Sequence, residues 1–212
     1  MASSAKENIL KKIRQALATP VPVPFPQAEG RNSVFQPLRK ELEIEFAENF
    51  TGLLGKFSFC LDERELVEQL QGLVATKKLS SIYCNEDSIK TKLVTRGFNH
   101  LVPTDLASCS ASITGCELLI SRTGSILMSS AQKSGRTASV YAPIHICIAY
   151  SNQLVYDIEE GLQTLKEKYS DKFPSLVTLA TGPSRTADIE KTLVVGIHGP
   201  KEVYLFLVEQ GT

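Results

Sequence analysis

The fold class of this chain can be predicted from residues 57–93, FSFCLDERELVEQLQGLVATKKLSSIYCNEDSIKTKL. Within them, residues 57–60 and 82–84 are short apolar runs that are typical of buried strands. Asp62 and Asn85 follow these runs, and both residue types predict that a helix begins just after them. The order strand, helix, strand, helix implies right-handed crossovers and a parallel sheet with helices on its faces.

The segments outside this stretch extend the pattern. Residues 38–53 have the apolar spacing of an amphipathic helix, and Asp157 predicts the start of another helix. Six further strands are predicted, at residues 117–121, 125–129, 138–142, 145–150, 176–180 and 203–208. The last of these is apolar at nearly every position, so we expect it inside the sheet. The predicted fold is α/β, with a mixed, largely parallel sheet and helices on both faces.

The N-terminal segment differs in character from the rest. Ser4 and Glu7 form a capping-box pattern, and the helix that follows carries apolar residues on one face. Alternating prolines then favour an extended, stiff connector, and they stand at Pro20, Pro22, Pro24 and Pro26. We therefore predict a helix and proline-rich linker over residues 1–37 and an α/β domain over residues 38–212. The helix is equally compatible with docking on its own domain or on a partner.

Charge and cysteine content exclude several classes of protein. Lys plus Arg and Asp plus Glu both total 23 in the 212 residues, so no net charge attracts nucleic acid or an anionic membrane. The odd number of cysteines argues against a disulfide framework, and the five are Cys60, Cys84, Cys109, Cys116 and Cys147. Because no pair has CxxC spacing and no His/Cys cluster occurs, we expect no metal or iron–sulfur site in this chain alone.

Targeting signals are not evident. The chain begins as a polar helix without an apolar signal region, and reduced cysteines fit a cytoplasmic location. The longest run without Asp, Glu, Lys or Arg, residues 137–156, contains Pro143, His145 and Asn152 and is too polar for a bilayer core. We expect a cytoplasmic protein with no membrane span.

The most informative polar segment is residues 181–190, TGPSRTADIE, between a predicted strand and a predicted helix. Gly182 permits a sharp turn and a close approach of the backbone. Ser184 or Thr186 would cap the helix, and Asp188 would favour its dipole. Ligands of open α/β sheets bind at the carboxyl ends of strands, so this loop is the first candidate site.

Arg185 is the residue in this loop that needs a separate explanation. A cation opposes the dipole at a helix N-terminus unless an anion binds there, between the guanidinium and free backbone N–H groups. A small phosphate or carboxylate is the expected ligand. The alternative is an internal ion pair of Arg185 with Asp188, Glu190 or Glu117.

Other loops contribute weaker candidates. His198 lies in a glycine- and proline-containing bend, where it is either a proton carrier or a partner of the turn backbone. Two glycine-bearing loops would join the anion site if all three loops meet at one sheet edge, and they supply Thr123, Gly124, Ser125 and Arg136. No GxSxG, Walker A or GxGxxG pattern occurs, so those nucleophile and nucleotide classes lose support.

Three segments carry a family resemblance. Residues 181–200, TGPSRTADIEKTLVVGIHGP, resemble the C-terminal signature of the LUD (lactate-utilisation domain) family, close to its protein C branch. Residues 113–125 resemble its central segment and residues 136–148 its following strand pair. Many relatives have an acidic residue where this chain has Arg122. Glu117 stands where relatives often have Asp, and it is the second candidate catalytic residue beside His198.

The resemblance implies a fold like that of the NagB/RpiA/CoA-transferase group. It also implies a role in oxidising L-lactate to pyruvate beside partner proteins that carry iron–sulfur clusters. This chain would then be an accessory or substrate-handling subunit without a cofactor of its own. Two other hypotheses about the function stay open. One is a stand-alone transferase, isomerase or ligase-like enzyme acting on a phosphorylated or CoA-linked molecule. The other is a non-catalytic metabolite-binding or assembly module.

Overall fold

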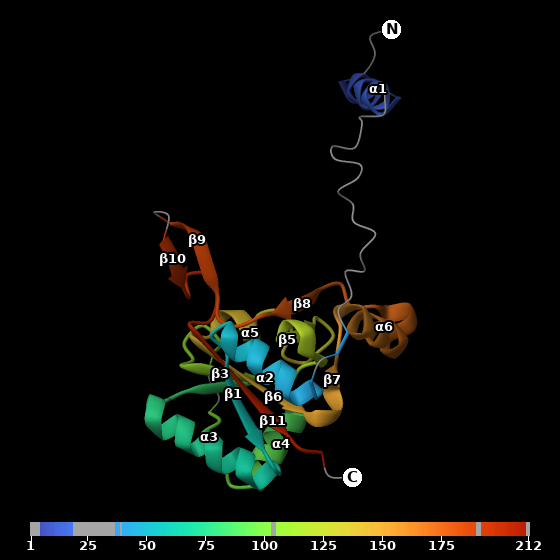
Figure 1. Cartoon of the computed structure of the whole chain (residues 1–212). Coiled ribbons are helices and arrows are strands. Elements are labelled where there is room, and N and C mark those ends of the chain that lie inside the picture. The colour runs from blue at the N-terminus through green and yellow to red at the C-terminus, as the bar shows by residue number, and fades with distance from the viewer. Residues whose placement is uncertain (1–4, 19–36, 39, 103–104, 190–191, 211–212) are drawn as a thin grey trace. The chain divides into compact units, whose positions relative to one another are not determined.

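The computed structural model describes residues 5–18, 37–38, 40–102, 105–189 and 192–210 (Figure 1). The chain divides into two units, residues 1–37 and 38–212. In the first unit, helix α1 spans Ala5–Ala18 and confirms the predicted helix. The predicted cap at Ser4 and the proline connector lie outside the described residues.

The described part of the second unit is built on a five-stranded parallel sheet. Its strands, in spatial order, are β1 (Lys56–Cys60), β11 (Glu202–Val208), β6 (Ile144–Tyr150), β3 (Ala111–Thr114) and β2 (Ile82–Cys84). β11 pairs with β1 on one side and β6 on the other, so it lies inside the sheet as its apolar sequence predicts. Because all strands run in the same direction, their carboxyl ends share one edge.

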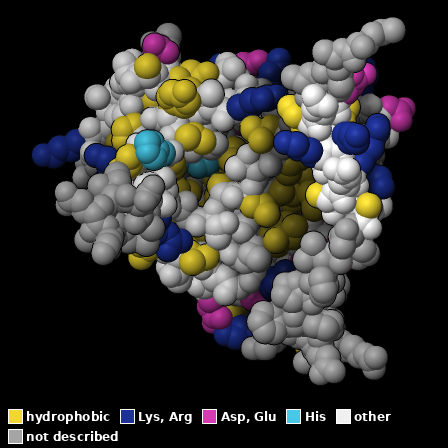
Figure 2. All heavy atoms as spheres, turned by 90° about the horizontal axis from the view of Figure 1, so that it is seen from above, with side chains coloured by type: hydrophobic (Ala, Val, Ile, Leu, Met, Phe, Trp, Pro, Cys, Tyr) yellow, Lys and Arg dark blue, Asp and Glu magenta, His cyan; other side chains and the backbone are white. Residues whose placement is uncertain are grey.

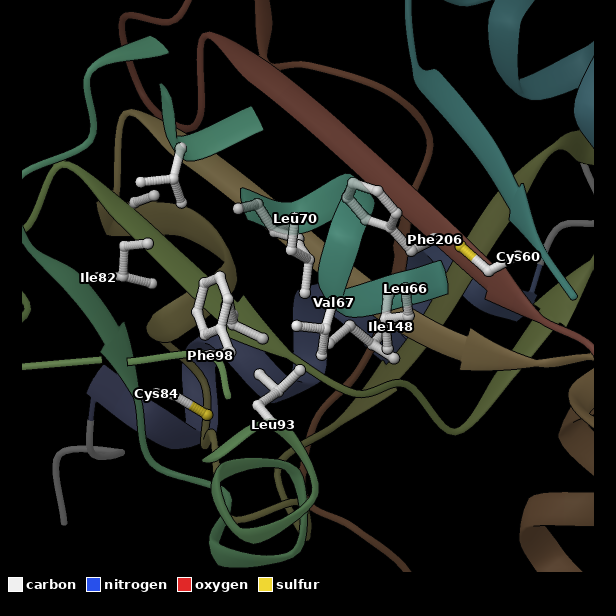
Figure 3. Close-up of a cluster of buried hydrophobic side chains, with 14 of the residues drawn as sticks. Cys60, Leu66, Val67, Leu70, Ile82, Cys84, Leu93, Phe98, Ile148 and Phe206 are labelled. Carbon is white, nitrogen blue, oxygen red and sulfur yellow. The ribbon is translucent and has the colours of Figure 1, made fainter. Parts of the chain in front are cut away.

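Helices α3 (Glu63–Lys77) and α4 (Asp87–Thr95) cover one face of this sheet. Figure 3 shows the core between them, where Leu70 and Leu93 from the helices meet Ile148 and Phe206 from the sheet. Asp62 caps α3 as predicted, because its Oδ1 accepts hydrogen bonds from the backbone N–H groups of the next turn. The N-cap residue of α4 is Glu86, one residue after the predicted Asn85.

A helix and a second sheet cover the opposite face. Helix α2 (Leu42–Gly52) buries Phe46 and Phe50 completely against the strands. The four-stranded second sheet has the order β7 (Leu154–Val155), β4 (Leu118–Ile120), β5 (Ser125–Ser129) and β8 (Val177–Ala180). Helix α6 (Ile158–Tyr169) packs on it through Leu165. The predicted α/β fold with helices on both faces is therefore confirmed.

Short helical turns connect some of these elements. The 3-10 helices are η1 (Ser121–Thr123), η2 (Ser151–Gln153) and η3 (Ser170–Lys172). In the described part of the chain, no helix combines the length and the apolar character needed to cross a membrane.

The predicted strand at residues 138–142 is wrong. The segment forms the short helix α5 (Ala138–Tyr141), with Thr137 O accepting from the N–H groups of Val140 and Tyr141. β6 begins after Pro143, and its two neighbours in the sheet are β3 and β11. The preceding residues therefore have no strand to pair with, and tertiary context overrides their β-propensity.

The helix predicted after Gly182 is also wrong. The structure has an antiparallel hairpin of β9 (Arg185–Ile189) and β10 (Thr192–Val195), which projects from the body of the unit (Figure 1). Two backbone hydrogen bonds of Ser184, to Pro200 O and from Gly196 N, fix the base of the hairpin. β-branched residues in both segments favour this pairing over a helix.

Candidate functional site

Two of the three predicted loops do meet. The hydroxyl oxygens of Thr123, Ser125 and Thr181 form a chain in which each neighbouring pair is 2.8 Å apart. Gly124 and Gly182, both with positive φ, approach the C-terminal end of α2. The turn between β4 and β5 and the loop after β8 therefore lie side by side, which a site shared by these two loops requires.

These loops lie at the amino edge of the parallel sheet rather than at its carboxyl edge. Ser184 N donates to Pro200 O just before β11, and Lys201 N donates to Pro143 O just before β6. In open α/β sheets, ligands bind at the other edge. Moreover, α2 directs its carbonyl end toward Gly124 and Gly182, and this end of a helix is negative. The location thus does not favour an anion.

Arg185 lies in β9 and its side chain is exposed. Because a strand replaces the predicted helix, no helix N-terminus is available to join it in binding an anion. No described residue forms an ion pair with Arg185, and Glu117 pairs with Lys168 instead. The side chains of Asp188 and Glu190 lie outside the described residues.

Arg136 lies far from the hydroxyl chain. Its guanidinium donates to Ser175 Oγ, near the end of the β5–β8 pair where Ser129 is opposite Val177. Thr181 follows the other end of the same strand pair. Arg136 and the Thr181 loop therefore do not form one site.

Glu117 is buried at the junction of the second sheet and α6, with 5% of its surface exposed. Its carboxylate accepts hydrogen bonds from Ser129 Oγ at 2.5 Å, Tyr169 OH at 2.6 Å and Lys168 Nζ at 2.7 Å. Burial raises its pKa, but these hydrogen bonds outweigh burial and the pKa is lowered. This carboxylate has hydrogen bonds to both α6 and β5, so its role is to hold these two elements together.

His198 is exposed beside a hollow of about 430 Å³ at the amino edge, which Tyr141, Pro143, Ile197 and Lys201 also line. Figure 2 views the molecule from this side and shows an exposed histidine among hydrophobic side chains. The hollow does not contain Glu117, so the two predicted catalytic residues do not act together.

The carboxyl edge of the parallel sheet carries a larger cleft. It consists of two adjoining hollows of about 490 Å³ and 410 Å³, which share Lys92, Tyr150 and Gln210. The first hollow lies beside residues that follow β1 and β11, and the second beside residues that follow β2, β3 and β6. We call the two together the carboxyl-edge cleft. Its position is the usual ligand site of an open α/β sheet.

Four side chains form a connected cluster in this cleft. Lys92 Nζ donates to Tyr150 OH at 2.7 Å and lies 4.3 Å from the centre of the tyrosine ring. Tyr150 OH donates to Glu63 Oε1 at 2.9 Å, and Lys92 Nζ lies 3.2 Å from the same oxygen. The guanidinium of Arg96 pairs with Glu63 Oε2.

Electrostatics fix the charges of this cluster. Burial lowers the pKa of Lys92, but the hydrogen bonds with Tyr150 and Glu63 outweigh it and the pKa is raised. Burial raises the pKa of Tyr150, the hydrogen bond with Lys92 lowers it and the hydrogen bond with Glu63 raises it, so the pKa of Tyr150 is raised overall. The same hydrogen bonds lower the pKa of Glu63 against the effect of burial. At neutral pH the cluster therefore presents an ammonium, a neutral phenol and a guanidinium around the carboxylate of Glu63, while Asp62, Glu86 and Glu209 line other parts of the cleft.

Two side-chain hydrogen bonds fix the loop that lines the second hollow. Glu86 Oε1 accepts from Gly115 N at 2.8 Å and holds the loop after β3. Gln153 Nε2 donates to Cys116 O at 2.8 Å and fixes the next residue of this loop. This loop is therefore preorganised, and it borders Lys92 and Tyr150 on the side away from Glu63.

This cluster was not predicted from the sequence. Lys92 resembles a solvated cation on an amphipathic helix, and Tyr150 ends an apolar run. Glu63 is separated from both in sequence. The available signal is that polar residues directly after parallel strands share one edge, and it becomes usable only once the strand order is known.

The cysteines are buried and free, which confirms the prediction for Cys60, Cys84 and Cys147. Among the described residues, no three His, Cys, Asp or Glu side chains are grouped so that they could hold a metal ion.

Comparisons with known proteins give the family. Lactate utilization protein C of Deinococcus radiodurans is 33% identical over 105 residues, which cover 49% of this chain and 49% of that protein. The protein of the same name from Bacillus licheniformis is 32% identical over 99 residues, covering 46% and 41%. The chain thus spans about half or less of these relatives. A third, from Shouchella clausii, is 25% identical over 170 residues, covering 80% and 69%.

A solved structure and a family model extend this likeness. The crystal structure of a DUF162 family protein from Deinococcus radiodurans superposes with a TM-score of 0.60 at 21% identity, covering 81% of this chain and 99% of that one. At this identity it shows a shared fold. The LUD domain model matches residues 44–208, which is most of the chain. The chain therefore belongs to the LUD domain family.

Proposed function

We propose that this chain is an accessory or substrate-handling subunit of a cytoplasmic system that oxidises L-lactate to pyruvate, with iron–sulfur clusters on partner proteins. We further propose that it binds a small carboxylate in the carboxyl-edge cleft and has no cofactor of its own. The names of its relatives support the metabolic role. The observation that carries the binding role is the position of Lys92 beside Tyr150 in this cleft.

Lys92 and Arg96 suit a carboxylate ligand because both remain partly accessible. Their side chains are 48% and 41% exposed although both contact Glu63. Charge-assisted hydrogen bonds from an ammonium and a guanidinium are the strong contacts that a small acid needs. The phenol of Tyr150 offers a neutral partner for the hydroxyl group of lactate or the keto group of pyruvate.

The test is a titration of the full chain with L-lactate and with pyruvate, followed by NMR. Signals near Lys92, Tyr150 and Gln210 should shift, and Lys92→Ala should abolish the shifts. Lys90→Ala is the matched control, because Lys90 lies on the same helix and pairs with Asp87 outside the cleft. Absence of shifts at millimolar ligand, with and without partner proteins, would contradict the proposal.

The same titration also tests the sequence-predicted loop. If the shifts centred on Gly182, Ser184 and Thr186 and were lost in Arg185→Ala, the anion site would lie at the amino edge instead. The proposed role in lactate oxidation would stand, but the binding site would lie at the amino edge of the sheet and not in the carboxyl-edge cleft.

A second function is favoured by the size of the cleft. Either hollow alone falls in the range of roughly 300–1,000 Å³ that holds drug-sized ligands, and a three-carbon acid is much smaller. This supports an enzyme acting on a phosphorylated or CoA-linked molecule. Thermal-shift measurements with sugar phosphates and CoA esters discriminate, because a larger shift than that with lactate, lost in Lys92→Ala, would favour this function.

A further inference from the structure

We infer that the carboxylate of Glu63 occupies the position of the ligand's own carboxylate among the cations of the cleft, so that Glu63 is an internal competitor that sets the affinity for carboxylic acids. This inference rests on the proposed carboxylate site in the carboxyl-edge cleft. It assigns a specificity-determining role to Glu63 and a chemical class, a planar two-oxygen anion, to the ligand.

The hydrogen-bond donors around Glu63 support this inference. Oε1 accepts from Tyr150 OH and faces Lys92 Nζ, while Oε2 pairs with the guanidinium of Arg96. All three donors come from α4, the residue after it, and the end of β6, whereas Glu63 comes from α3. Three donors divided over two oxygens match a carboxylate, and the fork of a guanidinium favours this planar group.

Neighbouring acids do not have this role. Asp62 lies one residue earlier, but its Oδ1 accepts from the N–H groups of Arg64 and Glu65 and so caps α3. Glu65 accepts from Leu61 N and Gln69 Nε2. Among the carboxylates of the first turn of α3, Glu63 is thus the one that uses its oxygens for the cations of the cleft.

Glu63 can leave this position without loss of the helix. It is the first residue of α3, and the cap is supplied by Asp62. The helix is anchored by Leu66, Val67 and Leu70, which are buried in the core below the cleft (Figure 3). Its side chain is 20% exposed, so a path toward solvent exists. A ligand carboxylate then replaces one set of ionic hydrogen bonds by another, and the exchange lowers the net affinity.

The test uses Glu63→Gln in the full chain, titrated with L-lactate and with inorganic phosphate by NMR. The amide keeps an acceptor for Tyr150 but removes the competing charge, so L-lactate should bind about tenfold more tightly. Glu68→Gln, on an exposed position of the same helix, is the matched control and should leave the affinity unchanged. If Glu63→Gln does not fold, Glu63→Asp withdraws the carboxylate by one methylene and should give a smaller gain.

The outcomes separate this inference from the proposed function. Unchanged or weaker lactate binding in a folded Glu63 variant, with binding still lost in Lys92→Ala, overturns the inference and leaves the proposed site intact. Tighter binding of lactate by Glu63→Gln than by the unaltered chain supports the inference. An equal gain for phosphate overturns the assigned ligand class. No binding by any of these proteins at tens of millimolar overturns both the inference and the proposed site.

Discussion

Gly182 lies against the backbone carbonyl of Leu53, so closely that a Cβ atom added to the glycine would be 2.3 Å from that oxygen. The φ angle of Gly182 is +81°, a region that side chains other than hydrogen disfavour. Gly182→Ala should therefore destabilise the domain by about 3 kcal/mol, since the strained backbone and the clash with α2 add up. Urea unfolding followed by circular dichroism measures this loss.

Gly72→Ala is the matched control for that substitution. Gly72 lies within α3, and a Cβ added there would meet no atom within 4 Å. Alanine at this position should stabilise the domain by about 0.5–1 kcal/mol, because glycine is a poor residue inside a helix. Equal effects of the two substitutions would contradict the close contact between Gly182 and α2.

Much of the fold could be predicted because its signals are local. Asp62 and Asp157 both cap the predicted helices through backbone hydrogen bonds. The strand that ends at Val208 lies inside the sheet, as its continuous apolar sequence predicts. The helix predicted after Gly182 failed because turn residues that start a helix also start a hairpin. The choice depends on the hydrogen bond from Ser184 to Pro200, which no local pattern encodes.

The candidate site was less predictable because it depends on strand order. The loops that contain Ser125 and Thr181 were candidates for one site if they met at a sheet edge, and their hydroxyl groups do meet. They meet at the amino edge, however, because β8 belongs to the second sheet rather than to the parallel one. Lys92 and Tyr150 are 58 residues apart, and only the position of α4 beside the end of β6 brings them together.

The link between Glu117 and α6 gives a second prediction. Tyr169→Phe removes one of the three donors to a buried carboxylate, which should cost about 1.5–3 kcal/mol. Tyr83→Phe is the control, since the hydroxyl of Tyr83 has no hydrogen-bond partner among the described residues, and it should change stability by less than about 0.5 kcal/mol. Both are measured by urea unfolding. Equal stability of the two variants would refute a stabilising role for this hydrogen bond.

The ion pair between Arg122 and Asp157 gives a third prediction. Arg122 Nε and Nη2 donate to the two carboxylate oxygens of Asp157 at 2.8 Å and 3.1 Å, and Asp157 also accepts from Ile158 N at the start of α6. Arg122→Lys keeps the charge but loses the two-point contact, so it should cost about 1 kcal/mol. Arg64→Lys, on an exposed position, should have no measurable effect in the same unfolding experiment. A loss as large in Arg64→Lys would show that the geometry of the Arg122 contact is unimportant.

His145 gives a prediction on pH dependence. Its imidazole is buried on the face of the parallel sheet that packs against the second sheet. Its Nε2 lies 2.8 Å from Thr114 Oγ1, and its Nδ1 has no hydrogen-bond partner among the described residues. Burial lowers the pKa of His145 to about 4 from 6.5. A protonated ring would place a second N–H group in this site without an acceptor, so the folded protein keeps the ring neutral.

The sign of the effect follows from proton uptake on unfolding. Between pH 6.5 and pH 4 the unfolded chain binds a proton at His145 and the folded chain does not, so stability falls as the pH falls through this range. From pH 7 to pH 5 the loss should be roughly 2 kcal/mol.

The lowered pKa values of Glu117 and Glu202 also reduce stability at acidic pH, so the effect of His145 is measured as a difference between a His145 variant and the unaltered chain. His145→Gln, unfolded in urea at both pH values, should lose less stability than the unaltered chain by that amount, and an identical pH dependence would mean that His145 is already protonated in the folded protein.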